Sequence, residues 1–281
     1  MVAASLAERL GYAHDDHILI VNCDDLGSSH AANVAIEDAF RRGFATSATL
    51  MVPCPWAFEA AERLRGFDVG VHLTLTAEYA GYRWRSLTGA RSLHNADGYL
   101  PATADEVFAN ASLDDARAEC RAQIAQALAW GLDVTHIDTH MGAVQTDPRF
   151  HALYIDLAAE FRLPLRMAGE SGERVLGFEC RRPAAERGLL FTDHFISPRW
   201  AEPTRPVLES RIPKLRPGVT EIYLHPVVDG PELRAYDPAA ADIRAGDYRN
   251  IMDADLRDLI ERSGVRLISY RPLRDLQRAN A

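Results

Sequence analysis

The fold of this chain is most constrained by a series of short apolar runs that each end in a side chain able to bind a metal or move a proton. The first run, residues 17–21, is followed closely by two adjacent aspartates. Such runs are typical of buried strands in a parallel sheet. The carboxyl ends of parallel strands meet at one edge, so we expect these side chains to converge on one site. The other three runs are residues 68–72, 134–140 and 219–225. In order, the four runs lead to Asp24 and Asp25, to His72, to His140 and to His225.

Segments with helical spacing of apolar residues alternate with these strands. Predicted helices run from Ser28 or Ser29 to about Arg42, and over 56–64, 113–130, 148–161, 203–215 and 247–263. Further strands are predicted at 47–52, 165–167, 189–196 and 265–270. This β–α alternation predicts an α/β protein with a parallel sheet and outer helices. Seven or eight such units favour closure into an irregular TIM-like (β/α) barrel.

We expect a single barrel domain over residues 1–281, because barrels of this length form one unit. Two loop insertions interrupt the pattern, at 76–112 and 227–246, and both leave from strand ends that carry histidines. Long loops in such positions are often lids. Tyr82 and Trp84 of the first loop are candidates for stacking on the apolar faces of a sugar. The alternative, that these rings only pack the loop against the barrel, is equally open.

Composition narrows the class of partner. The chain carries 31 basic and 40 acidic residues, a net charge of −9, which argues against nucleic acid and anionic membranes as partners. Its four cysteines form no CxxC pair, which argues against a thiolate zinc site. We find neither a signal peptide nor an apolar stretch long enough to span a membrane, and therefore expect a cytoplasmic location. Whether the chain forms a homodimer is open.

One carboxylate and two imidazoles suit a divalent metal, and Asp25, His72 and His140 supply them at strand ends. His136, Asp138 and His140 alternate, so all three share a face if the strand continues. His136 or Asp138 is then either a ligand in its own right or an outer partner that orients a ligand ring. We favour the outer role for both.

Three further residues have competing interpretations. Asp24 either faces the site with Asp25, if the chain turns there, or caps the following helix. His225 is suited to act as a general acid near neutral pH, or is a structural histidine at a barrel rim. Arg166 lies in the predicted strand 165–167, where it binds a substrate hydroxyl, braces Asp24, or forms a salt bridge at the barrel end.

Six motifs stand in a fixed order along the chain: residues 22–27, 43–47, 70–76, 136–140, 220–226 and 264–270. Taken together, they resemble the YdjC-like carbohydrate deacetylases, also called the ChbG/HpnK group. The resemblance extends from about residue 18 to residue 273, and the order and spacing of the motifs make it specific. The sequence departs from the family pattern at 141–145, where many members continue with further histidines, and at Cys23, which replaces a usual alanine. These departures concern the substrate more than the reaction.

The resemblance implies a barrel related to polysaccharide deacetylases that removes N-acetyl groups from amino sugars. It implies one divalent metal ion, magnesium or zinc, on Asp25, His72 and His140. It further implies Asp24 as the catalytic base, with His225 matching the family's strand-end histidine as the acid. The expected partner is a small carbohydrate substrate.

Two rival functions remain at this point. A non-haem iron oxygenase would use His136, Asp138 and His225 as a facial triad, but this leaves Asp24, Asp25 and His72 without a role. A non-catalytic sugar-binding barrel is the second rival, and an intact set of acid, base and ligands argues against it.

Overall fold

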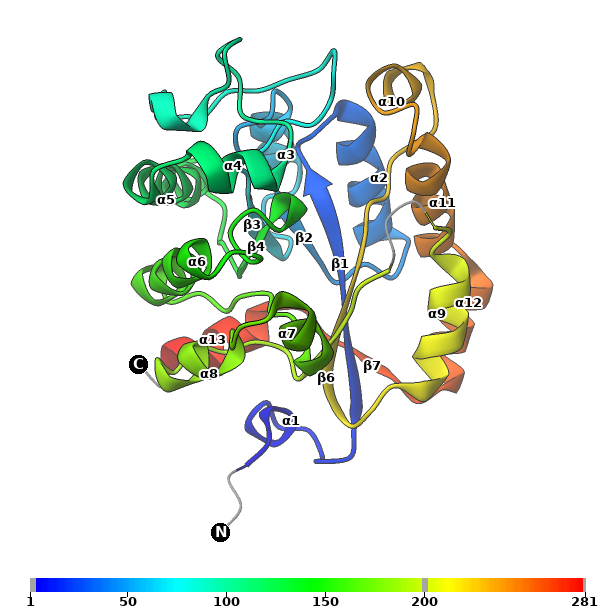
Figure 1. Cartoon of the computed structure of the whole chain (residues 1–281). Coiled ribbons are helices and arrows are strands. Elements are labelled where there is room, and N and C mark those ends of the chain that lie inside the picture. Colours follow the sequence, from blue (N-terminus) through cyan, green and yellow to red (C-terminus); the bar gives the residue numbers. More distant parts are fainter. Residues whose placement is uncertain (1–3, 199–201, 280–281) are drawn as a thin grey trace.

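The structure, a computed structural model, describes residues 4–198 and 202–279, so the ends of the predicted 1–281 domain lie outside it. Its centre is a parallel sheet with the strand order β4-β3-β2-β1-β6-β5, and β7 pairs with β1 beside β2 (Figure 1). The strands are β1 His17–Leu26, β2 Ser47–Leu50, β3 Val69–Leu73, β4 Ile137–Thr139, β5 His194–Ile196, β6 Gly218–Leu224 and β7 Arg266–Leu267.

The sheet curls into a half-barrel, which confirms the predicted (β/α)-barrel class. Beyond β4, Ile137 forms a parallel bridge with Leu165, and the Leu165 N–H donates to the carbonyl of Leu190 at 3.1 Å. The segment around Leu165 therefore spans the gap between β4 and the chain leading into β5. The strand predicted over 165–167 is reduced to this one bridge, and of the strand predicted over 189–196 only β5 forms.

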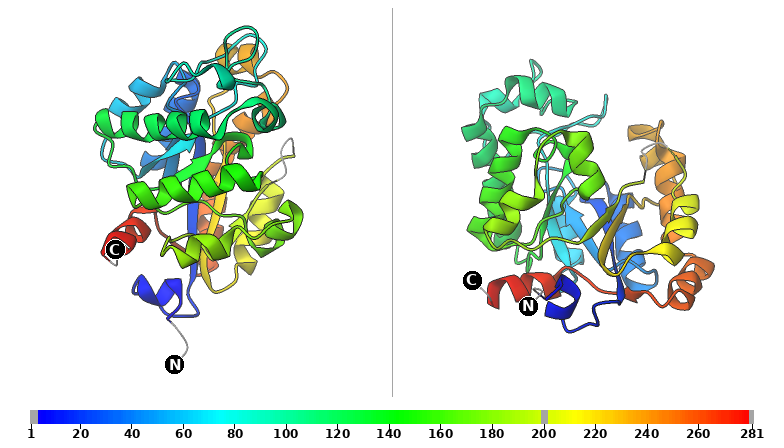
Figure 2. Two further views of the ribbon diagram at one scale, coloured as in Figure 1. Left: turned by 60° about the vertical axis from the view of Figure 1, so that its left-hand side comes forward. Right: turned by 60° about the horizontal axis from the view of Figure 1, so that its bottom comes forward.

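The longer helices lie outside the sheet, as the alternation predicted (Figures 1 and 2). Both predicted loop insertions also contain helices: η1 and α4 in the first, α10 and the start of α11 in the second. The helical elements are α1 Leu6–Arg9, α2 His30–Arg41, α3 Ala57–Arg63, η1 Arg91–Leu93, α4 Ala104–Asn110, α5 Leu113–Ala129, η2 His140–Gly142, α6 Pro148–Phe161, α7 Glu170–Leu176, α8 Arg181–Glu186, α9 Arg205–Arg211, η3 Ile212–Lys214, α10 Pro231–Tyr236, α11 Ala241–Ile251, α12 Ala254–Arg262 and α13 Arg271–Ala279.

The prediction of one continuous helix over 247–263 is wrong. Helix α11 ends at Ile251, and α12 begins at Ala254. Between them, Asp253 has extended backbone angles, and its carboxylate accepts a hydrogen bond from the Leu256 N–H at 3.0 Å. Aspartate is common at the position before a helix, because its side-chain oxygen accepts a hydrogen bond from a backbone N–H of the first turn. Asp253 therefore starts a new helix where periodicity alone suggested continuation.

Strand β1 is buried from Ile18 to Leu26, which explains its uninterrupted apolar start. Alternate residues face opposite sides. Ile18 and Ile20 pack in a small cluster that includes residues of α1 and α13. Leu19 and Val21 belong to the main core. With both faces covered, β1 is held rigidly, and its carboxyl end has a fixed position.

In the described part of the chain, no helix is long and apolar enough to cross a membrane.

Gly70 on β3 packs so closely against His136 that a larger residue there should destabilise the protein. A Cβ built on Gly70 would lie 2.6 Å from both the ring Nδ1 and the carbonyl oxygen of His136. The His136 ring is held between this backbone and Tyr270, so it has little room to move. Gly70→Ala should therefore lower the free energy of unfolding by about 1–3 kcal/mol. Chemical denaturation measures this, with Gly81→Ala, which meets open space, as the matched control. Equal stability of the two variants would contradict the packing argument.

Candidate metal centre and active site

Asp24 and Asp25 both face one cavity because the end of β1 is irregular. The register of β1 against β2 shifts between Cys23 and Leu26, and Asp25 has a φ of 65°. Neighbouring residues of a regular strand point to opposite faces. The left-handed backbone at Asp25 turns the chain, so both carboxylates line the same cavity. Such a conformation costs roughly 1–3 kcal/mol at a non-glycine residue and is concentrated at functional sites.

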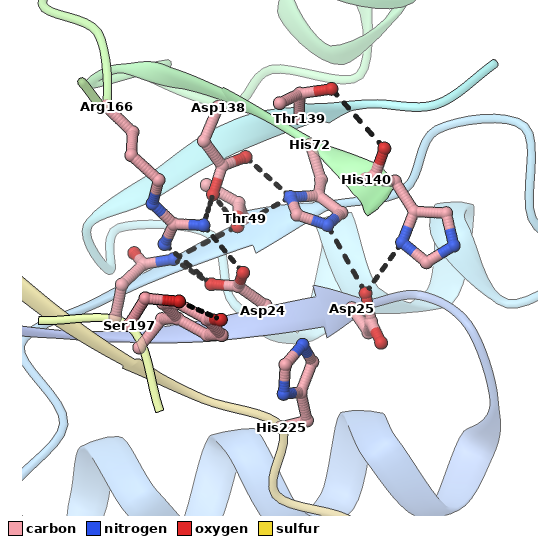
Figure 3. Close-up of polar contacts among 12 residues, drawn as sticks. Asp24, Asp25, Thr49, His72, Asp138, Thr139, His140, Arg166, Ser197 and His225 are labelled. Carbon is pink, nitrogen blue, oxygen red and sulfur yellow. Dashed lines mark hydrogen bonds and ion pairs between the residues drawn. The ribbon is translucent and has the colours of Figure 1, made fainter. Parts of the chain in front are cut away.

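One carboxylate oxygen and two imidazole nitrogens lie close together in this cavity. Asp25 Oδ1 lies 3.3 Å from His72 Nε2 and 3.2 Å from His140 Nδ1 (Figure 3). All three side chains are buried, and among the described residues Asp25 Oδ1 accepts no hydrogen bond of good geometry, only the two longer contacts with the imidazoles. Ligands ~2.0–2.1 Å from a zinc or magnesium ion lie roughly 3 Å from one another. The donor types, the spacing and the unsatisfied oxygen therefore fit a divalent cation.

Each imidazole of this group is oriented by a carboxylate on its other nitrogen. His72 Nδ1 donates to Asp138 Oδ1 at 2.6 Å, and His140 Nε2 donates to Glu78 Oε2 at 3.0 Å. Thr49 and Arg166 in turn hold the second oxygen of Asp138, at 2.8 and 2.9 Å. This arrangement fixes which nitrogen of each ring faces Asp25. Asp138 thus has the contact expected of an outer partner. Sequence reasoning missed Glu78, because it lies in a loop beyond the end of β3.

His136 lies apart from this group. Its ring stacks on Tyr270 with a centroid separation of 3.8 Å, and its Nδ1 is 2.9 Å from the hydroxyl of Thr135. Burial holds the pKa of His136 well below its usual value. His136 continues the pairing with β3, since the Val71 N–H donates to its carbonyl, whereas His140 lies in the turn after β4, so regular alternation does not extend to His140. The outer contact on a ligand ring that we favoured for His136 is therefore absent.

The described residues contain two groups that could hold a metal, Asp25–His72–His140 and Asp24–His72–Asp138. Neither group includes His136 or His225, so the facial triad of the iron-oxygenase alternative does not form. In the second group, the Arg166 guanidinium already contacts both carboxylates. We therefore take the first group as the candidate metal site.

Asp24 is held by Arg166 in a two-point ion pair. Nη1 and Nη2 of Arg166 donate to the two oxygens of Asp24 at 2.6 and 2.7 Å, and Asn22 adds a hydrogen bond at 2.8 Å. Burial alone would raise the pKa of Asp24, but Arg166 outweighs it and lowers the value to about 2. Asp24 is therefore ionised at neutral pH. The cap of helix α2 is Ser29, not Asp24.

Arg166 braces the site. Besides Asp24 and Asp138, its Nε donates to Glu221 at 2.8 Å, so three buried carboxylates surround the guanidinium. Of the roles considered from sequence, these contacts favour bracing of Asp24 over the binding of a substrate hydroxyl.

His225 follows directly after β6 and lines the cavity opposite the two ligand histidines (Figure 3). Its backbone N–H donates to Asp247 Oδ2 at 2.9 Å, and its ring meets Tyr223 edge-on at 5.3 Å. Burial lowers the pKa of His225 below its usual value. A neutral imidazole at neutral pH is thus available to exchange a proton within the cavity.

The cavity has a volume of about 500 Å³. The aromatic rings that line it are not those of Tyr82 and Trp84, which the sequence suggested. Trp84 is only 3% exposed, and its ring N–H donates to the carbonyl of Thr76 at 2.8 Å. Tyr82 is half-buried and donates to the carbonyl of Ser28 at 2.7 Å. Neither ring is among the residues that line the cavity. The cavity is lined by Asp24, Asp25, His72, Glu78, Thr139, His140, Met141, Gly142, Gln145, Thr146, Arg166, Phe195, Ser197, Tyr223, His225 and Arg244.

Phe195 and Tyr223 are the aromatic rings that do line the cavity, and they stack at a centroid separation of 5.7 Å. Sequence reasoning missed both. A signal existed for Tyr223, because it stands two positions before His225 and shares its face if the strand continues. Phe195 lies in a three-residue strand, which is too short to show a pattern.

The curled sheet with a carboxylate–histidine group at its carboxyl edge defines a (β/α) barrel of the polysaccharide deacetylase type. A family model described as "YdjC-like protein" matches residues 18–262, so the chain belongs to the YdjC-like family. A carbohydrate deacetylase of Thermus thermophilus is 35% identical over 82% of this chain and 84% of its own length. One from Geobacillus stearothermophilus is 31% identical over 90% and 96%.

A solved structure shares the architecture of this chain. A putative cellobiose-phosphate cleavage protein of Enterococcus faecalis superposes with a TM-score of 0.79 and 25% identity. The alignment covers 92% of this chain and 99% of that one. The architecture is therefore shared over nearly the full length.

Removing a ligand histidine should abolish metal binding. His72→Ala and His140→Ala each delete one of the two imidazoles that face Asp25, and loss of a direct ligand should weaken zinc binding by at least about 100-fold. His136→Ala is the control, because its ring contacts Tyr270 instead. Elemental analysis after dialysis measures occupancy, and circular dichroism checks folding. Full occupancy in both ligand variants, or loss only in His136→Ala, would contradict the assignment.

Metal binding should also release protons. Burial would lower the pKa of His72, but Asp138 and Asp25 outweigh it and raise the value to about 10. Glu78 and Asp25 likewise raise the pKa of His140 to about 9 against the effect of burial. Both rings are thus protonated at neutral pH without metal, and a cation must displace these protons. Affinity should rise about tenfold or more per pH unit between about pH 6 and 8. Calorimetry in buffers of different ionisation enthalpy counts the protons, and a pH-independent affinity would contradict this charge state.

Proposed function

We propose that this protein is a metal-dependent deacetylase that hydrolyses the N-acetyl group of an amino sugar or oligosaccharide. The main observation behind this proposal is that a possible cation site and an ionised carboxylate line one cavity. The cation site is formed by Asp25, His72 and His140, and the carboxylate is Asp24. Membership of the YdjC-like family and the carbohydrate deacetylases among its relatives support the choice of substrate class.

Asp25, His72 and His140 would hold one divalent ion, magnesium or zinc. Such an ion supplies Lewis acidity, which lowers the pKa of water and polarises a carbonyl oxygen. Imidazole nitrogens favour zinc, whereas carboxylate oxygen suits magnesium as well. The outer contacts of Asp138 and Glu78 keep both rings in the tautomer that faces Asp25.

Asp24 is proposed to accept the proton of the attacking water. Its two-point contact with Arg166 keeps the carboxylate ionised and fixes its direction. The low pKa makes Asp24 a weak base, so it can act only on a water that is already acidified. In the net reaction, the amide C–N bond breaks, a C–O bond to water forms, and acetate and a free amine leave.

His225 is proposed to donate a proton to the leaving amine. It enters the cavity from β6, opposite the histidines from β3 and the turn after β4 (Figure 3). Proton transfer of this kind typically contributes about 10²–10⁴-fold to the rate. Because burial lowers its pKa, the imidazole is neutral beforehand, and the proton that it passes to the amine is the one that Asp24 removed from water, so no proton is gained or lost overall.

The sugar ring is proposed to pack on Phe195 and Tyr223. Their faces offer an apolar surface for C–H groups. Met141 is 46% exposed and lines the same cavity. It adds a further apolar surface beside the two rings. Substrate preference is therefore expected to follow these three side chains more than Tyr82 and Trp84.

Asp24→Asn should retain metal and lose most turnover. The amide keeps the size of the side chain but cannot accept a proton, so kcat should fall about 10²–10⁴-fold. The assay measures acetate released from a panel of N-acetylated mono- and oligosaccharides by metal-loaded protein. Asp97→Asn, which alters an exposed carboxylate far along the first loop, is the matched control. Turnover near the wild-type level in Asp24→Asn would exclude its role as base, and no acetate from any substrate with the wild type would exclude the function.

A further inference from the structure

A buried arginine outside the sheet contacts the candidate metal ligand. Arg244 lies on α11, is 2% exposed, and was not singled out by sequence reasoning. Its Nη1 donates to Asp25 Oδ2 at 2.7 Å, its Nε donates to Asp237 Oδ2 at 2.7 Å, and its Nη2 donates to the hydroxyl of Tyr79 at 2.8 Å. One guanidinium therefore joins three separate parts of the chain.

The two oxygens of Asp25 have different surroundings. Oδ2 accepts the hydrogen bond from Arg244, whereas Oδ1, among the described residues, has only the longer contacts with His72 and His140. A carboxylate can bind a cation through one oxygen or through both. The positive charge of the Arg244 guanidinium on Oδ2 repels a cation there, so Oδ1 is the favoured ligand atom. Arg244 thereby selects the coordination mode of Asp25.

The same side chain reaches the loops on both sides of the cavity. Tyr79 belongs to the segment 76–112 after β3, and Asp237 belongs to the segment 227–246 after β6. The rings of Tyr79 and Tyr236 also meet edge-on at 5.0 Å, so the two segments touch each other. Displacement of either segment would pull on the guanidinium that holds Asp25.

We propose that Arg244 is a positioning residue that fixes Asp25 as a one-oxygen metal ligand and couples both cavity loops to the metal site. The proposal rests on the metal site of the proposed function, but not on the reaction. Arginine suits this role because its planar fork offers several donors in fixed directions. Lysine carries one ammonium group and cannot present the same fork to Asp25, Asp237 and Tyr79 together.

The first test uses cobalt(II) as the probe, because its visible absorption reports coordination number without any substrate. Arg244→Gln should free Asp25 Oδ2, change the cobalt spectrum towards a higher coordination number, and weaken affinity about 10–100-fold. Arg234→Gln is the matched control: it removes an arginine of α10 that pairs with Asp229 and Asp242 at the surface. Wild-type spectrum and affinity in Arg244→Gln, even with a lower melting temperature, would overturn the proposal.

The second test isolates the loop contact and remains informative if Arg244→Gln does not fold. Tyr79→Phe removes only the hydroxyl that accepts from Arg244. Cobalt should slow amide hydrogen exchange in the segment 76–80 of the wild type at least about threefold, and Tyr79→Phe should lose this slowing while affinity changes less than about twofold. An unchanged response in Tyr79→Phe would overturn the coupling.

These readouts separate the inference from the proposed function. A wild type that binds cobalt and releases no acetate from any sugar excludes deacetylation but leaves the role of Arg244 measurable. A wild type that binds no cobalt overturns the metal site and the role of Arg244 together.

Discussion

The structure of the site depends on charge compensation between buried carboxylates and two buried arginines. Arg166 contacts Asp24, Asp138 and Glu221, while Arg244 contacts Asp25 and Asp237. Taking a charge out of water costs several kcal/mol unless hydrogen bonds and opposite charges replace the lost hydration. Negative charge still exceeds positive charge here, since five carboxyl groups face two guanidinium groups. A divalent cation, or protons on the two ligand histidines, would neutralise most of the remaining excess.

Much of the site could be predicted from sequence, because its central residues stand at the ends of strands. Asp24, Asp25 and His72 follow from apolar runs and from the rule that parallel strands end at one edge. The roles of Arg166 could only be stated as alternatives, and its contacts separate them. The outer contact expected of His136 is not made, because alternation predicts a shared face but not which partner a side chain meets on it, and the His136 ring stacks on Tyr270.

The parts that could not be predicted come from loops and from distant helices. Glu78 and Arg244 occupy no strand end, and Arg244 is separated by 219 residues from the aspartate that it holds. Only tertiary packing brings such pairs together, and no local spacing encodes it. Trp84 shows the converse problem: an aromatic residue in a polar loop resembled a ligand-stacking ring, yet it fills the core. The sequence around a buried aromatic residue in a loop looks the same as the sequence around an exposed one.

The pairing of β1 has a consequence for how the protein is made. On one edge, β1 pairs with β6 from His17↔Gly218 to Cys23↔Leu224, about 200 residues later. At a synthesis rate of about 5–20 residues per second, the first strand leaves the ribosome roughly 10–40 s before its partner. During that interval an apolar strand has an open edge, which can pair wrongly with other chains. The nascent chain is therefore expected to need chaperone protection until most of it has been translated.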